Sequence, residues 1–234
     1  MLTVGESFDA FITAESAKLK SGNRVFYAGS QVQRYYQFLI VILDRYRADE
    51  RAFLVANDAV LTLARAGSVA QDEHVHRLNH AMFLLQVEIE SFYLFAKILL
   101  DRMARFIEHF FGPERGLSLD SHDKLAKNIR SYCAEKGLAV DEAFLSRIVE
   151  LRELVADFRD KQIAHENSPR TLRGISWAPS GGLTMVLRPV FPDESEGFRI
   201  STELAAVATS IDGYIASICS FIQTNGDRSC HARK

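Results

Sequence analysis

The stretch FLLQVEIESFYLFAKILL, residues 83–100, is apolar on most of the circumference that it would present as an α-helix. It lies within a longer segment that starts near Asp72 and runs to Gly112-Pro113, a pair of residues that ends helices. A helix of this kind is stable in water when other elements surround it. We therefore expect a central, buried helix over residues 72–111, with the rest of the chain packed around it.

The first 70 residues predict further helices. Residues 7–20 alternate hydrophobic and polar side chains in the pattern of a short helix that ends near Ser21-Gly22. Ser30 is a candidate N-cap for an apolar helix that runs to Arg47, and Asp49 is a candidate N-cap for another that stops at Gly67. We expect these two helices to form an antiparallel hairpin.

Three helices are expected after the central one. Asp120 or Ser121 begins a helix that stops at Gly137, and Asp141 begins the helix that runs to about residue 167. The last helix starts at Ser201 or Thr202, and its isoleucine-rich seam is spaced by fours and threes. Such a seam suits packing onto the bundle or onto a second subunit.

Residues 175–178 and 183–187 are β-prone runs joined by Pro179-Ser-Gly-Gly, which predicts a β-hairpin. The fold class is therefore all-α, an up-and-down helical bundle with a small β-hairpin inserted before the C-terminal helix. We expect one domain over 1–234 because no linker divides the chain. Its parts are N-terminal helices 1–70, a helical core 72–167, the hairpin 173–190 and the C-terminal helix 201–224.

Composition limits the function. The 234 residues carry a formal net charge of −2, so the chain has no broad basic field with which to coat nucleic acid. Three cysteines without a C-x-x-C pair argue against a disulfide scaffold or a cysteine-rich zinc site and fit a reducing compartment. We find no targeting segment or membrane span in the sequence, and expect a cytoplasmic protein without a membrane partner.

Some polar residues have two interpretations. Glu88 and Glu90 lie in the apolar stretch, where a structural ion pair is favoured over an acid–base role. His76 and His80 have the i,i+4 spacing of metal ligands, but two histidines do not complete a tetrahedral shell, so we expect no metal site. Trp177 suits packing better than stacking on a base.

The predicted helix over residues 121–137 is basic. Its cationic side chains are typical of a solvated helix exterior, and they are also where phosphate contacts would be sought. They are Lys124, Lys127, Arg130 and Lys136.

Residues 158–167, FRDKQIAHEN, close the helix that starts at Asp141. Apolar residues upstream form one stripe at Phe144, Ile148, Leu151, Val155 and Phe158. On an uninterrupted α-helix Gln162 lies near the centre of this stripe, with Arg159 and His165 about 60° to either side. Arg159 and His165 are then roughly 9 Å apart along the axis, close enough to act on one phosphate. Asp160 lies nearly opposite the stripe.

Arg159, the polar Asp160 and His165, late in a helix of an all-α chain, resemble the motif of the HEPN superfamily, the higher eukaryotes and prokaryotes nucleotide-binding domains. The resemblance covers roughly residues 72–167 and the last helix. It implies a dimer that brings two Arg/His pairs into one groove. It also implies a metal-independent endoribonuclease of the kind found in toxin–antitoxin and phage-defence systems, with RNA and an antitoxin protein as partners.

The chemistry of the two residue types agrees with that expectation. His165 can exchange a proton with the 2′-hydroxyl of RNA near neutral pH, and Arg159 can hold the phosphate in a bidentate contact. Asp160 and Gln162 are supporting residues. No glycine-rich phosphate loop, nucleophile elbow or H-E-x-x-H pair is present in the sequence, so nothing supports a hydrolase of those classes or a nucleotide kinase. We expect no cofactor. The alternative is a non-catalytic helical module that binds a protein, a nucleotide or RNA, in which Arg159 forms a structural salt bridge.

Overall fold

The central helix is α3, Asp72–Phe111, whose bounds agree with the expectation from sequence. The computed structural model describes residues 4–68, 72–157, 170–177, 183–189, 199–200 and 204–230. Between Phe92 and Phe110, one residue or two in every turn of α3 is essentially inaccessible to solvent, including Tyr93, Leu99 and Met103. The all-α bundle predicted from this stretch is confirmed.

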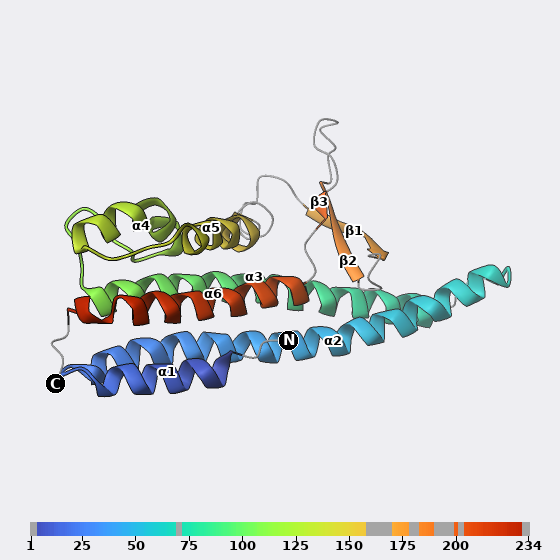
Figure 1. Cartoon of the computed structure of the whole chain (residues 1–234). Helices are drawn as coiled ribbons and strands as arrows, with labels where there is room; N and C mark the ends of the chain where they lie inside the picture. Colours follow the sequence, from blue (N-terminus) through green and yellow to red (C-terminus); the bar gives the residue numbers. More distant parts are fainter. Residues whose placement is uncertain are drawn as a thin grey trace.

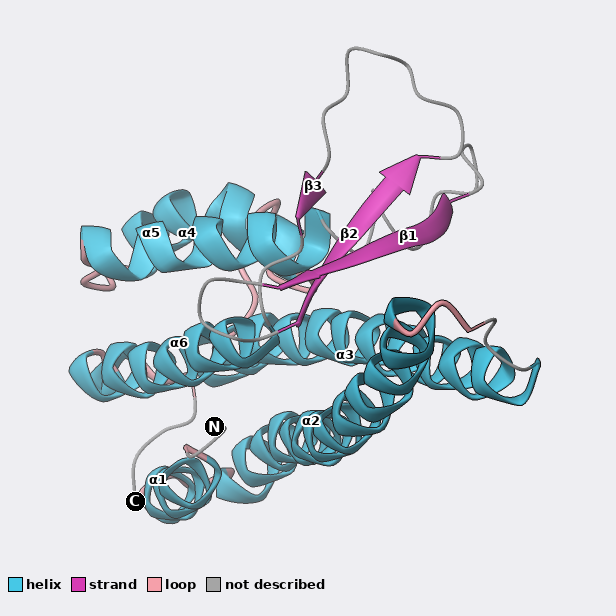
Figure 2. Cartoon of the chain, turned by 90° about the vertical axis from the view of Figure 1, so that its right-hand side faces the viewer, coloured by secondary structure: helices cyan, strands magenta, loops and turns pink. Residues whose placement is uncertain are grey.

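The helices form three layers (Figure 1). One layer holds α1 and α2, the middle layer holds α3 and α6, and the third holds α4 and α5, as the view turned by 90° also shows (Figure 2). The bounds of the other helices are Gly5–Ala17 for α1, Gly22–Arg65 for α2, His122–Lys136 for α4, Glu142–Leu151 for α5 and Leu204–Thr224 for α6. Two short helices, the π-helix η1 and the 3-10 helix η3, span Arg152–Asp157 and Gly226–Arg228.

The prediction of two helices within residues 30–67 is wrong, because α2 is one helix of 44 residues. The Ser30 hydroxyl donates to the carbonyl of Phe26 four residues back, as a residue inside a helix does, and therefore caps nothing. Around Asp49 the chain contains no glycine or proline that would end a helix. The polar residues there belong to the solvated side of a continuous helix.

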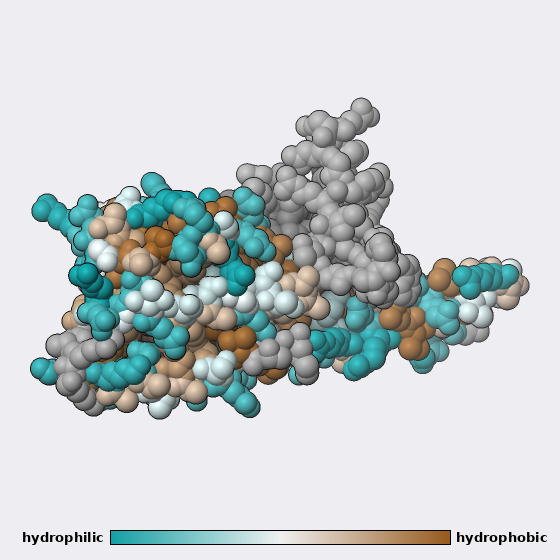
Figure 3. All heavy atoms as spheres, in the orientation of Figure 1, coloured by the Kyte–Doolittle hydropathy of each residue, from teal (hydrophilic) through white to brown (hydrophobic). Residues whose placement is uncertain are grey.

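The second half of α2 and the first half of α3 project beyond the other helices (Figure 1), and we call residues 46–65 and 72–87 the distal arm. The arm has its own small core of Phe53, Ala81 and Leu85. It also exposes large hydrophobic side chains, with Val55 73% and Phe83 60% accessible. Figure 3 shows hydrophobic surface on this projection among hydrophilic residues.

Both predicted ends of α4 are confirmed, and so is the predicted start of α5; the predicted end of the latter helix, near residue 167, lies outside the described residues. The Ser121 hydroxyl accepts a hydrogen bond from the backbone N–H of Lys124 at the start of α4, and Gly137 ends that helix with a φ of 63°. The Asp141 carboxylate accepts from the backbone N–H of Phe144, at 2.7 Å, at the start of α5. Local capping chemistry therefore decides these boundaries.

The strands β1, β2 and β3 span Arg170–Trp177, Leu183–Pro189 and Arg199–Ile200. Their backbones pair antiparallel in the order β1-β2-β3. The turn of the expected hairpin falls on residues 178–182, outside the described part of the chain.

Among the described residues, α6 is the one helix long and apolar enough to cross a membrane by length and composition. The core helix of a globular bundle passes the same test, and half of the relevant part of α6 is buried inside this structure. Its single charged residue, Asp212, accepts a hydrogen bond from the Tyr36 hydroxyl of α2 at 2.8 Å. The apolar seam expected of this helix thus packs onto the bundle, with Ile211, Ile215 and Ile218 buried.

Gly29 sets how closely α1 approaches α2. A Cβ atom at this position would lie 2.6 Å from Cδ1 of Ile12. We predict that Gly29→Ala lowers the free energy of unfolding by about 1 kcal/mol, because overpacking costs more than the gain of about 1 kcal/mol in helix propensity. Urea denaturation measures the change.

Ile12→Val provides the control for this prediction, since it removes the methyl group that the new Cβ meets first. The valine substitution should cost less in the Gly29→Ala background than in the wild type. Strictly additive effects would contradict the proposed contact.

Candidate functional site

The four residues chosen from sequence, Arg159, Asp160, Gln162 and His165, lie in the segment 158–169, outside the residues that the structure describes. What the structure describes is the helix that leads to them. The apolar stripe of this helix is confirmed over its described part, because Phe144, Ile148, Leu151 and Val155 are all buried.

The helix does not remain regular up to Arg159. Residues Arg152–Asp157 form the π-helix η1. A π-helix turns through fewer degrees per residue than an α-helix, because its hydrogen bonds span five residues instead of four. The 100° step by which Gln162 was placed on the stripe therefore does not hold through η1.

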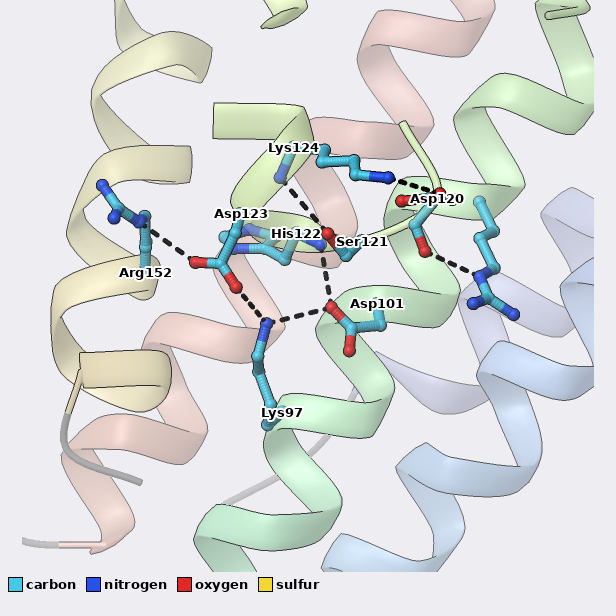
Figure 4. Close-up of polar contacts among 9 residues, drawn as sticks. Lys97, Asp101, Asp120, Ser121, His122, Asp123, Lys124 and Arg152 are labelled. Atoms are coloured by element: carbon cyan, nitrogen blue, oxygen red, sulfur yellow. Dashed lines mark hydrogen bonds and ion pairs between the residues drawn. The ribbon is translucent and has the colours of Figure 1, made fainter. Parts of the chain in front are cut away.

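A chain of ion pairs joins the start of η1 to the centre of the bundle (Figure 4). The Lys97 ammonium lies 3.1 Å from the Asp101 carboxylate and 2.7 Å from that of Asp123. The second oxygen of Asp123 accepts from Nε of Arg152 at 3.1 Å. We call these four residues the ion-pair chain, and it ties α3 to the first turn of α4 and to η1.

Burial decides the electrostatics of this chain. The Lys97 side chain is 7% exposed and sits between the two carboxylates. Burial alone would raise the pKa of Asp123, but the bonds to Lys97 and Arg152 outweigh it and lower that pKa below its ordinary value. Both carboxylates of the chain are engaged, so it anchors η1 and leaves neither of them free for catalysis.

His122 lies beside the ion-pair chain and is fully buried. Its backbone N–H donates to Asp101 at 2.8 Å, and its ring packs edge-on against Tyr214 of α6, with 5.5 Å between the centroids. Within the described part of the chain, neither ring nitrogen has a hydrogen-bond partner. Burial, and then the charge of Lys97, lower the pKa of His122 to about 3. The imidazole is therefore neutral and closed off from solvent.

No sequence motif marks Lys97, Asp101, His122 or Arg152 as site residues. One signal was available, because Lys97 and Asp101 are an i,i+4 pair of opposite charges within an apolar run. The link from Lys97 to Asp123 spans 26 residues and carries no local signature.

The structural ion pair expected of the two acidic residues in α3 is present for Glu88 and not for Glu90. Glu88 is buried and lies 2.5 Å from Arg45 of α2, which confirms the ion-pair interpretation. Burial raises the pKa of Glu88 above its ordinary value, although Arg45 opposes the shift. Glu90 is exposed and accepts from the Gln86 amide one turn earlier.

The basic residues of α4 are largely neutralised by neighbouring acids. Lys124 binds Asp120 at 2.7 Å, and Lys136 lies 3.3 Å from Glu114. Arg130 holds Glu142 through both carboxylate oxygens, at 2.8 and 2.6 Å. This helix is therefore a solvated exterior face more than a phosphate-binding one.

The histidines at the start of α3 lie on the distal arm. His76 and His80 are exposed, and no group of three His, Cys, Asp or Glu residues in the described ranges is placed to hold a metal ion. His74 and His80 instead line a hollow of about 540 Å³ with Arg51 and several alanines.

Comparisons with protein-family models, with curated proteins and with solved structures find no match. The resemblance to the HEPN superfamily therefore depends on the residues quoted above.

The ion-pair chain yields a prediction for stability. Lys97→Met leaves two carboxylates facing each other, and we expect it to lower the free energy of unfolding by about 2 kcal/mol. The value lies below that of a fully buried pair because Asp101 and Asp123 are 30% and 43% exposed. Urea denaturation at neutral pH measures the change.

Lys124→Met is the matched control, because it breaks an exposed pair and should change stability by less than about 0.5 kcal/mol. In the double variant Lys97→Met/Asp123→Asn, part of the loss should be recovered. Equal losses from the two lysine substitutions would refute a special role for Lys97.

The lowered pKa of His122 makes the stability of the protein depend on pH. Its folded-state pKa of about 3 lies below the unfolded value of about 6.5, so between these values the unfolded chain binds a proton that the folded chain does not. Its contribution to stability is therefore lost as the pH falls below about 6.5, by up to about 1.4 kcal/mol per pH unit. His122→Phe keeps a ring against Tyr214 and should remove this contribution.

Urea denaturation between pH 7.5 and pH 5 tests the difference in slope. His76→Phe, at an exposed histidine of the same chain, should retain the wild-type slope. Identical slopes for His122→Phe and the wild type would show that His122 is not the group responsible.

Proposed function

We propose that this protein is a metal-independent endoribonuclease in which Arg159 and His165 act on the RNA phosphate. The observation that carries the proposal is the π-helix η1, which ends at Asp157, two residues before Arg159. π-helical turns are rare and occur frequently at functional sites. This one is held at its first residue, Arg152, by the ion-pair chain. The chain that leads to Arg159 and His165 is thus anchored to the bundle. Such anchoring suits a catalytic pair, because a small error in the position of a catalytic group lowers the reaction rate strongly.

The reaction needs no group beyond these side chains and the RNA itself. One imidazole removes the proton of the 2′-hydroxyl, whose oxygen attacks the adjacent phosphorus. The bond from phosphorus to the 5′-oxygen breaks, and a second imidazole protonates that oxygen. The products are a 2′,3′-cyclic phosphate and a 5′-hydroxyl, and phosphorus keeps its oxidation state. The RNA loses one proton and gains one, and the two imidazoles regain their starting protonation states by proton exchange with water.

Each side chain has a separate role in this scheme. His165 exchanges protons, and Arg159 stabilises the charge on the non-bridging oxygens by a bidentate contact. Two imidazoles on opposite sides of the phosphorus require two copies of His165, so the enzyme acts as a homodimer. Asp160 and Gln162 orient the pair.

A second function, a helical interaction module without catalysis, is favoured by the distal arm. The arm exposes Val55, Phe83 and Val75 on a projection that has its own core. Exposed hydrophobic side chains grouped in this way mark protein-binding surfaces. An antitoxin protein seated on the arm is compatible with both functions.

Cleavage of total cellular RNA in EDTA tests the proposed function. We expect the wild type to cut RNA and to leave 2′,3′-cyclic phosphate ends, with His165→Ala and Arg159→Ala each reducing the rate by at least about 100-fold. Primer extension and end-specific ligation identify the products.

His76→Ala and Arg115→Ala, at exposed positions of the same residue types, are the matched controls and should retain full activity. Circular dichroism shows that each variant is folded. Intact RNA after incubation with folded wild-type dimer would rule out the ribonuclease and leave the interaction module.

A further inference from the structure

A hollow of about 500 Å³ lies between the first turns of α2 and the last turns of α3. Residues Asn23, Arg24, Tyr27 and Gln31 line it from α2. From α3 it is lined by Arg102, Arg105, Phe106 and His109, at helical steps of three and four. We call it the arginine–tyrosine pocket. It lies at the end of α2 opposite to the distal arm.

The charge of this pocket is unbalanced. Arg24, Arg102 and Arg105 line it, and no aspartate or glutamate is among the described residues that do so. The nearby carboxylate of Asp120 is bound by Lys124 at 2.7 Å. The arginines of the pocket therefore differ from the basic side chains of α4, which acidic partners neutralise. The Asp120 carboxylate also acts electrostatically on Arg105. The described lining itself nevertheless contributes three guanidinium groups and no carboxylate, and such an excess of positive charge favours an anionic ligand.

Two of the arginines are positioned by contacts that leave donors available. Nε of Arg105 donates to the Asp120 carbonyl at 2.7 Å, and the Arg102 guanidinium lies 5.6 Å from the centre of the Tyr35 ring. A guanidinium has five N–H donors, and stacking on a ring occupies none of them. Both groups therefore keep the edge that binds a phosphate in bidentate fashion.

The aromatic side chain at the mouth of the pocket is Tyr27, which is 69% exposed. Phe106, which is 1% exposed, lines the pocket from the core side. The amides of Asn23 and Gln31 each offer both donors and acceptors at the same place. A stacking ring, amides that can read a base edge and phosphate-binding arginines together match one unit of nucleic acid, a base joined to a phosphate.

We propose that the arginine–tyrosine pocket binds one nucleotide, with its base stacked on Tyr27 and its phosphate held by Arg24 and Arg102. The nucleotide is a unit of a single RNA strand, and this assignment rests on the proposed ribonuclease function. The same chemistry would hold a free mononucleotide, and the experiment separates the two sources. The pocket then acts as a docking point for the strand, apart from the Arg159–His165 segment in sequence.

The test is fluorescence anisotropy of a labelled single-stranded RNA decamer with the full-length His165→Ala protein, in which the proposed cleavage cannot occur. Tyr27→Ala should raise Kd roughly ten-fold, since stacking on an aromatic ring contributes that much per base. Arg24→Ala should weaken binding and also reduce the slope of log Kd against log salt by about 0.7, the value for one phosphate contact on a single strand.

Matched variants separate this binding from general effects. Tyr27→Phe keeps the aromatic ring that Tyr27→Ala removes. The Tyr27→Phe protein should therefore bind the decamer as tightly as the parent protein does. Phe26→Ala removes a neighbouring ring that does not line the pocket, and Arg65→Ala removes an exposed arginine at the far end of α2. Both controls should bind as the parent protein does.

Competitors identify the unit that is bound. AMP should displace the decamer, whereas adenosine and inorganic phosphate at the same concentration should not. Binding of AMP through Tyr27 without binding of the decamer would assign the pocket to a free nucleotide. Loss of binding with Arg24→Ala but not with Tyr27→Ala would overturn the proposal, because it would indicate a polyanion held by charge alone.

The failure of this proposal is distinguishable from that of the proposed function. Binding that depends on Tyr27, in a protein that cuts no RNA, would support the pocket and reject the ribonuclease. RNA cleavage by the wild type together with unchanged binding in Tyr27→Ala and Arg24→Ala would support the ribonuclease and reject the pocket.

Discussion

Lys97 places a positive charge in the central helix of this protein, and the positions of α4 and η1 depend on how that charge is balanced. Asp101 provides one negative charge from the same helix, and Asp123 provides the other from the first turn of α4. Asp101 also accepts the backbone N–H of His122, so it holds the start of α4 in two ways. Removing a cation from such a site is costly because the carboxylates remain partly desolvated. The position of α4 on α3 is therefore determined by charge as well as by apolar packing.

Much of the helical framework was predictable because its signals are local. Ser121, Gly137 and Asp141 act within one turn of the chain, and each one ends or begins a helix where the sequence indicates. Ser30 and Asp49 were misleading for the same reason, since serine and aspartate also occur on the solvated sides of helices. What distinguishes the two cases is the absence of a helix-ending residue nearby, together with the packing of a continuous α2 against α3.

The candidate site was less predictable from the sequence. The bond between Lys97 and Asp123 depends on the packing of α4 onto α3, which no short pattern encodes. The π-helix over Arg152–Asp157 likewise follows no composition rule, and it interrupts the regular 100° step of the α-helix. The sequence is equally uninformative about which basic residues have acidic partners. Those of α4 and those of the arginine–tyrosine pocket look alike in the sequence, and they differ in whether an acidic residue from another part of the chain lies beside them.

The uninterrupted course of α2 has a geometric consequence. Tyr27 and Val55 are on the same continuous helix, 28 residues apart, which corresponds to roughly 42 Å along its axis. A helix without proline or glycine in this interval apart from Gly29 curves without a sharp kink, as Figure 1 shows. Two molecules bound at the two ends would consequently be held at a constant spacing. The number of residues in α2 between the arginine–tyrosine pocket and the distal arm thus sets the distance between the two binding surfaces.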